Sequence, residues 1–131
     1  MNDTKKNTIA VRMTVAAAIV AAASLGNAAA QDVKPSYLAN PDIYKVIAQD
    51  DRYIVMEVTW KGGQKDNMHS HPKGLVVHYL TDCHSRTTTR DGKVAENKRK
   101  AGETVVAAPV AAHTFENLAT TDCKHIHVEA K

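Results

Sequence analysis

After residue 50, the apolar residues of this chain fall in short runs that are rich in β-branched and aromatic side chains. Polar or glycine-containing breaks separate these runs at nearly regular intervals. The clearest runs are residues 52–60, 75–81, 86–90, 93–96, 103–107 and 125–129. Asp91-Gly92 is a strong hairpin signal between two of them, and Pro109 ends another. From residue 31 onward no segment has helical periodicity, so the pattern predicts an all-β sandwich or barrel.

The first 30 residues have a different pattern. Lys5, Lys6 and Arg12 precede an apolar stretch at residues 13–25, and alanines at 28–30 supply a cleavage site of the A-x-A type. The stretch is short for a membrane-spanning helix, so we expect a signal peptide at residues 1–30, with an uncleaved anchor as the alternative. The mature protein is then exported to the periplasm or secreted, with no membrane contact after cleavage. Residues 31–43 predict an irregular arm, and residues 44–131 a single barrel domain.

The positive charge of the chain comes partly from these first 30 residues. Without them, 14 basic and 13 acidic residues remain, and the net charge falls from +3 to +1. The short basic run at residues 97–100 therefore predicts a solvated loop, and we expect no nucleic-acid partner. The chain has neither a glycine-rich phosphate loop nor a nucleophile elbow, which argues against nucleotide-binding and hydrolase functions.

Two cysteines, Cys83 and Cys123, are present in the predicted mature chain. An exported protein folds in an oxidising compartment, so an even number of cysteines favours one disulfide over free buried thiols. Closing a loop of this length would stabilise the fold by about 4 kcal/mol in the chain-entropy model.

The strongest chemical signal is His69-Ser70-His71, with His113 following 42 residues after His71 and Asn117 four residues later. Two histidines separated by one residue on a strand point to the same face. A third imidazole from another strand can then complete a set around one metal ion, and three such ligands leave a coordination position open for water or substrate.

These residues resemble the two motifs of the cupin superfamily, in particular its small, exported, single-domain members. Gly63 precedes His69 as in the first motif, G-x5-H-x-H, and Gly102 precedes His113 by 11 residues as in the second. The resemblance covers roughly residues 50–131. It implies a cupin jelly-roll barrel of the RmlC-like type in which His69, His71 and His113 bind a divalent transition metal, one of Fe, Zn, Mn, Ni or Cu.

The chain also departs from the motifs. The first-motif glutamate should lie at position 75 or 76, where the chain has Leu75 and Val76. If Val76 is the counterpart, His78 shares its inward face and is a possible fourth ligand or proton shuttle. If Leu75 is the counterpart, His78 points outward.

The resemblance also suggests roles for other residues. The strands that carry Cys83 and Cys123 would be antiparallel neighbours, which favours the disulfide over a metal site of these cysteines with His84 and His125. In a cupin the last strand lies away from the metal, so His125 and His127 are expected to be surface or satisfied histidines. Tyr79, Met68 and Trp60 are candidate pocket residues. Asn117 is a possible pocket residue that more plausibly steadies the turn of the second motif.

Two function classes follow from the resemblance. The first is an oxidoreductase of the dioxygenase type acting on a small organic substrate. The second is a non-catalytic barrel that binds a metal or a small-molecule ligand in the periplasm. A homodimer is expected from the family and from the need to cover exposed strand edges.

Overall fold

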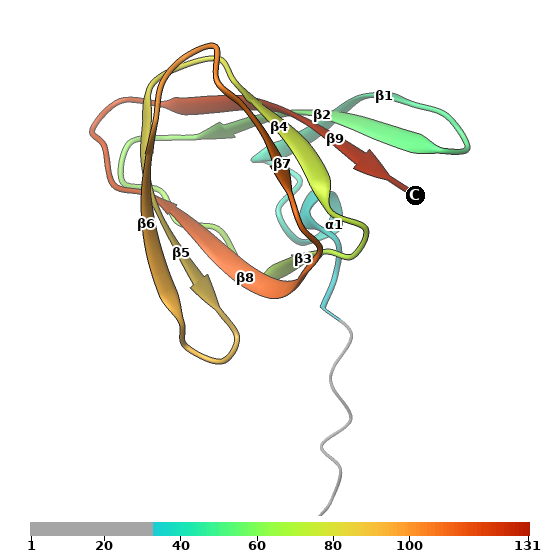
Figure 1. The fold of residues 1–131 in the computed structure, drawn as a ribbon, viewed down its shortest axis with the longest axis horizontal. Helices are drawn as coiled ribbons and strands as arrows, with labels where there is room; N and C mark the ends of the chain where they lie inside the picture. The colour runs from blue at the N-terminus through green and yellow to red at the C-terminus, as the bar shows by residue number, and fades with distance from the viewer. Residues whose placement is uncertain (1–32) are drawn as a thin grey trace, which may run out of the picture. The chain divides into compact units, whose positions relative to one another are not determined.

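Two facing antiparallel sheets make up most of residues 33–131, the part of the chain that the computed structural model describes (Figure 1). The larger sheet has the strand order β1-β2-β9-β4-β7 and the smaller one β3-β8-β5-β6. The elements are α1 (Ser36–Ala39), β1 (Tyr44–Gln49), β2 (Tyr53–Trp60), β3 (His69–His71), β4 (Leu75–Tyr79), β5 (Cys83–Thr89), β6 (Val94–Arg99), β7 (Thr104–Ala107), β8 (Val110–Asn117) and β9 (Cys123–Ala130). The prediction of an all-β fold is confirmed.

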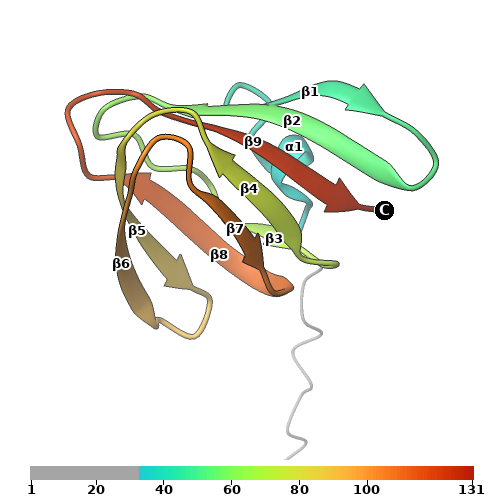
Figure 2. The same cartoon turned by 45° about the horizontal axis from the view of Figure 1, so that its top comes forward.

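The N-terminal arm is more ordered than its prolines suggest. It contains the single turn of helix α1, and Pro35 forms an isolated bridge to Ser70 in β3. In Figure 2 α1 lies beneath β2 and β9, and its residue Ser36 contacts Met56 of β2 and Glu129 of β9. The expectation of an irregular arm was therefore wrong for residues 36–39. The predicted signal peptide lies outside the described residues. No helix within residues 33–131 is long and apolar enough to span a membrane.

The core lies between the two sheets and follows from strand alternation. On β2, every second side chain points inward, and these residues are Ile54, Met56, Val58 and Trp60. Successive strand residues face opposite sides, so one inward residue determines the orientation of the whole strand.

The same alternation on β4 decides between the two alignments of the first motif. Leu75, Val77 and Tyr79 are buried, whereas Val76 and His78 face outward. Of the two residues that could replace the glutamate of the first motif, Leu75 is therefore the one that points inward. His78 is exposed, and its Nδ1 is 2.9 Å from the hydroxyl of Thr104. The hypothesis that His78 is a fourth ligand or pocket residue was wrong.

The predicted hairpin at Asp91-Gly92 is confirmed between β5 and β6. Gly92 has a φ of +83°, a conformation that glycine adopts without steric cost, and its N–H donates to the carbonyl of Thr89. The basic run is not a loop, because residues 97–99 belong to β6 and pair with β5. Lys100 follows the strand and forms an ion pair with Asp82 at 2.6 Å.

The predicted disulfide Cys83–Cys123 is present, with the two Cα atoms 5.1 Å apart. It differs from expectation in its position. Cys83 is the first residue of β5 and does not end the preceding strand, so the disulfide joins the smaller sheet to β9 of the larger one. Both cysteines are buried. The predicted homodimer stays a prediction, as do its contacts through strand edges.

Candidate metal centre

Three imidazoles from two paired strands converge inside the barrel. His69 on β3 lies directly opposite His113 on β8, and an irregularity in the pairing after His69 brings His71 opposite Val110. The ring centroids are 4.9 Å apart for His69 and His71, 4.5 Å for His69 and His113, and 5.1 Å for His71 and His113. One nitrogen of each ring lies within 4.8 Å of the other two. The fold thus brings together the three histidines that the motifs indicated.

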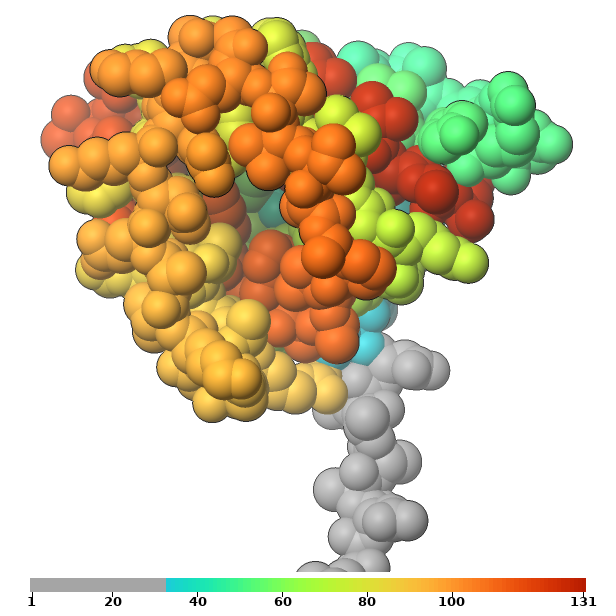
Figure 3. Space-filling model, viewed as in Figure 1, coloured from blue at the N-terminus to red at the C-terminus, as the bar shows by residue number. Residues whose placement is uncertain are grey.

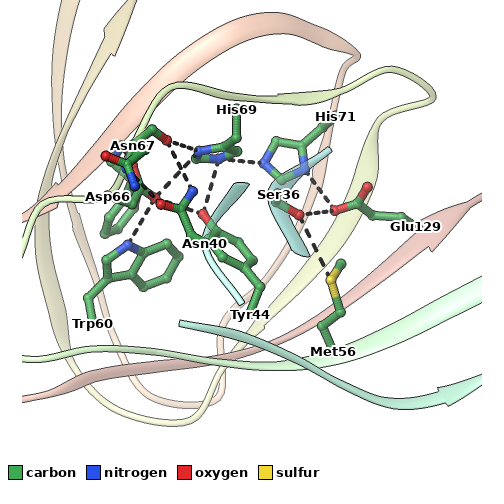
Figure 4. A network of polar contacts seen from close by, with 11 residues as sticks. Ser36, Asn40, Tyr44, Met56, Trp60, Asp66, Asn67, His69, His71 and Glu129 are labelled. Carbon is green, nitrogen blue, oxygen red and sulfur yellow. Dashed lines mark hydrogen bonds and ion pairs between the residues drawn. The ribbon is translucent and has the colours of Figure 1, made fainter. Parts of the chain in front are cut away.

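The outer nitrogens of two of these rings have partners that determine where their protons are. His69 Nδ1 is 2.9 Å from the backbone carbonyl of Asn67, and His71 Nδ1 is 2.7 Å from Oε1 of Glu129 (Figure 4). A carbonyl and a carboxylate only accept hydrogen bonds, so both Nδ1 atoms donate. When both rings are in the neutral form that metal binding requires, the two Nε2 atoms, 3.2 Å apart, carry lone pairs that face each other. This is the proton arrangement of metal-bound histidines.

A third lone pair comes from Tyr44, the first residue of β1. Its hydroxyl is 2.9 Å from Oδ2 of Asp66 and donates to that carboxylate, since the carboxylate can only accept. The phenol oxygen then presents a lone pair to His69 Nε2 at 3.1 Å. Asp66 also accepts from the Trp60 indole N–H at 3.0 Å and the Phe115 backbone N–H at 2.6 Å. Burial raises the pKa of Asp66 to about 6, although these three hydrogen bonds act to lower it.

These electron-rich atoms fit a cation. Protein nitrogens bind zinc at about 2.0–2.1 Å, so two nitrogens 3.2 Å apart can reach one ion together. His113 Nε2 is buried and has no hydrogen-bond partner within the described part of the chain. Burial lowers the pKa of His69 to about 3 and that of His113 to about 4, so both rings are neutral at neutral pH, as ligation requires. The 3.6 Å contact of His69 with Asp66 is therefore not an ion pair.

The N-terminal arm holds the strand that carries two of the three candidate ligands. Ser70 donates its backbone N–H to Lys34 and its hydroxyl to Val33, at 3.1 and 2.9 Å. Asn40 forms two hydrogen bonds with the backbone of Asn67, the residue whose carbonyl orients His69. The arm therefore fixes β3 along the edge that does not pair with β8.

The turn that follows β3 requires a glycine. Gly74 has a φ of +77° and donates to the carbonyl of His71 at 3.2 Å. A Cβ at this position would lie 2.7 Å from the carbonyl oxygen of Ala107 on β7. This close approach lets the chain turn from the smaller sheet directly into β4 of the larger one.

A cavity of about 140 Å³ adjoins the three histidines between the two sheets. His71 and His113 form part of its wall, and most of the rest is apolar. The apolar and aromatic lining residues are Tyr44, Trp60, Leu75, Val77, Tyr79, Val105, Ala107, Val110 and Phe115. In Figure 3 the surface is hollowed between β6 and β7, the edge strands of the two sheets. Trp60 and Tyr79 thus line the cavity, whereas Met68 lies at the surface and does not.

His125 and His127 are not surface residues. They are only 1% and 4% exposed, point inward from β9 and line the same cavity. His125 is satisfied on both nitrogens, but His127 Nδ1 has no hydrogen-bond partner among residues 33–131. The expectation of a surface or satisfied pair therefore fails for His127. The last strand lies between β2 and β4, so its inward face is at the centre of the larger sheet.

Asn117 is fully buried but is not a ligand. Its amide N–H groups donate to the carbonyls of Trp60, Lys61 and Thr121, and its Oδ1 accepts from the backbone of Ala119. All its hydrogen-bonding groups are thus used in holding the turn after β8. The alternative of a pocket role was wrong, and the turn-steadying role agrees with these contacts.

Sequence reasoning missed Tyr44, Asp66 and Glu129. A signal for Glu129 was present, because residues 123, 125, 127 and 129 share one face of a strand, so a buried disulfide at Cys123 would bring Glu129 to the inner face as well. Tyr44 and Asp66 had no such signal, since they reach His69 only through the packing of β1 and of the loop before β3.

No family model matches this sequence, and neither does any curated protein. Solved structures do resemble the fold. A cupin domain from Bordetella pertussis is 21% identical, with a TM-score of 0.62 over 68% of this chain and 92% of that one. An RmlC-like cupin from Methanocaldococcus jannaschii is 11% identical, with a TM-score of 0.55 over 67% and 78%. A double-stranded β-helix domain protein from Klebsiella pneumoniae is 22% identical, with a TM-score of 0.54 over 67% and 75%.

Proposed function

We propose, from the premise that this chain has the cupin fold, that it binds one divalent transition metal ion through Nε2 of His69, His71 and His113. The cavity beside the ion then takes a small organic ligand. The observation that carries the proposal is the convergence of one nitrogen from each of three imidazoles, two of which have Nδ1 hydrogen-bonded to outer partners.

The donor set limits the metal but does not select one. Three neutral imidazoles suit Fe(II), Zn(II), Cu(II), Ni(II) and Mn(II). No carboxylate stands at the position closest to the motif glutamate, because Leu75 points inward there. A metal held by the three histidines would therefore have a position left for water or a ligand, and His71 and His113 line the cavity that such a ligand would occupy.

A dioxygenase-type oxidoreductase is the second candidate function. It is favoured by the largely apolar cavity beside the three histidines, which would shelter an organic substrate from water. A bound Fe(II) ion would supply the chemistry that activates O₂. The residues of the chain would orient the substrate, through the walls formed by Tyr79, Phe115 and Val105.

We also propose that the protein works after export, in the periplasm or outside the cell. The Cys83–Cys123 disulfide supports this location, since such bonds persist in oxidising compartments.

Elemental analysis of the untagged protein, purified natively and after reconstitution with each metal, tests the proposed site. We expect about one equivalent of metal in the wild-type protein and a loss of most of it in His113→Ala, because removing one of three ligands opens the site. The exposed His78→Ala is the matched control and should keep the metal. Retention of a full equivalent by His113→Ala would refute the site. Iron in the native protein, with O₂ uptake on a small substrate, would favour the second candidate.

A further inference from the structure

A chain of buried imidazoles runs from the disulfide to the cavity, and the disulfide sets the direction of its hydrogen bonds. His125 Nε2 lies 3.0 Å from Sγ of Cys123 and 3.3 Å from Sγ of Cys83. Sulfur in a disulfide carries no hydrogen and can only accept, so His125 Nε2 must carry the proton of this neutral ring. Burial lowers the pKa of His125 to about 3, which keeps the ring neutral.

The proton on Nε2 leaves His125 Nδ1 with a lone pair. This atom is 3.2 Å from Nε2 of His127, which must therefore donate to it. His127 is also neutral, because burial lowers its pKa well below the usual range. Its single ring proton is then on Nε2, so Nδ1 carries a lone pair and is a hydrogen-bond acceptor.

This acceptor has nothing to accept from within residues 33–131. His127 is 4% exposed and lines the cavity together with His71 and His113. A buried acceptor without a partner costs on the order of 1–3 kcal/mol, so a donor from a ligand or a water molecule is expected there. The other residues that line the cavity are mainly apolar, and two of its histidines, His71 and His113, belong to the proposed metal centre.

We propose that His127 Nδ1 orients the ligand of this cavity, which is a small molecule with an apolar body, a metal-binding end and a hydrogen-bond donor such as a hydroxyl at the other end. The Cys83–Cys123 disulfide keeps His127 Nδ1 in the acceptor form through His125. The ligand class rests on the proposed metal centre, whereas the acceptor form of His127 does not.

The proton positions can be measured directly by long-range ¹H–¹⁵N correlation spectra of the histidine rings in the metal-free, oxidised protein. We expect both His125 and His127 to be protonated on Nε2 and unprotonated on Nδ1. Protonation of His127 on Nδ1 would overturn the inference, even if the protein binds metal. This measurement needs no variant and is independent of the outcome for the metal centre.

Ligand choice is tested on the zinc-loaded protein by calorimetric titration with two series of carboxylates. The first consists of glycolate, 3-hydroxypropanoate and 4-hydroxybutanoate. The second consists of propanoate, butanoate and pentanoate, which have a methyl group in place of the hydroxyl. We expect at least one hydroxy acid to bind about tenfold tighter than its methyl counterpart, the effect of one buried hydrogen bond. Equal affinities throughout both series would overturn the proposed ligand class.

Variants identify the residue that accepts a hydrogen bond from the hydroxyl group of the ligand. The preference should disappear in His127→Phe, which removes the acceptor, and should shrink in Cys83→Ala/Cys123→Ala, which frees the tautomer of His125. His78→Ala, on the outer face of β4, should keep the full preference. A preference that survives in a folded, zinc-loaded His127→Phe would refute the role of His127. Absence of zinc binding in the wild-type protein would instead refute the proposed metal centre and leave the tautomer measurement valid.

Discussion

At the scale of single residues, Glu129 is a carboxylate that contacts one histidine of the proposed metal centre from behind. Its Oε1 accepts from His71 Nδ1 at 2.7 Å, in a place where both side chains are almost fully buried. Ser36 donates to the same oxygen at 3.4 Å. A carboxylate behind a ligating histidine fixes the tautomer and increases the basicity of the nitrogen that faces the metal.

Glu129→Gln should weaken metal binding about 10- to 100-fold, because the amide still accepts from His71 but no longer carries a charge. Competition with a chelator of known affinity measures the change. Glu57→Gln, on the outward-facing side of β2, is the matched control and should keep the wild-type affinity. If Glu129→Gln binds metal as tightly as the control, Glu129 does not tune the centre.

At the scale of elements, β3 has only three residues and depends on the N-terminal arm for its position. It pairs with β8 on one side, and Pro35 bridges to Ser70 on the other. Asn40 adds two hydrogen bonds to Asn67, just before the strand, at 2.7 and 3.1 Å. The arm thus acts on His69 through Asn67, whose carbonyl is the partner of His69 Nδ1, and the last strand acts on His71 directly through Glu129.

Asn40→Ala should lower the free energy of unfolding by about 1–3 kcal/mol, because two partly buried hydrogen bonds to the backbone of Asn67 are lost and the Asn67 N–H loses its acceptor. Urea unfolding followed by circular dichroism measures the loss. The exposed Gln49→Ala should change stability by less than about 0.5 kcal/mol. An Asn40→Ala protein as stable as Gln49→Ala would mean that the arm does not hold β3.

At the scale of the whole molecule, the barrel interior contains an unusual number of imidazoles for its size. His69, His71, His125 and His127 are all less than 5% exposed, and His113 adjoins them. Burial lowers the pKa of His125 and His69 to about 3 and that of His113 to about 4. Histidines in the unfolded chain titrate near pH 6.5, so the unfolded chain binds more protons than the folded one between these values.

The metal-free protein should therefore lose stability as the pH falls from about 6.5 towards 4 and be most stable above that range. The depressed pKa values mean that this stability is present above the unfolded pKa and is lost on acidification. Urea midpoints measured at a series of pH values test this. His125→Phe should reduce the slope, and the exposed His78→Ala should not. A midpoint that is constant down to pH 4 would contradict the burial of neutral histidines.

The sequence alone determined the features that depend on local spacing. The β-branched runs and Asp91-Gly92 were sufficient for an all-β fold, and alternation put His69 and His71 on one face of a strand, because turn chemistry and strand alternation act over a few residues. The addition of His113 to this pair followed from the resemblance to the cupin motifs. The pairing of Cys83 with Cys123 followed from their number and the expected compartment.

The tertiary structure alone decided which face of each strand points inward and what lies opposite it. Strand alternation predicts that His78 shares a face with Val76, and that His127 shares a face with Cys123. Only the packing of the sheets turns the first face towards solvent and the second towards the core. Tyr44 and Glu129 come from strands far from the motifs in sequence, and they reach the histidines because β1 and β9 belong to the sheet that faces β3 and β8. Register between distant strands depends on the whole core, which no local pattern contains.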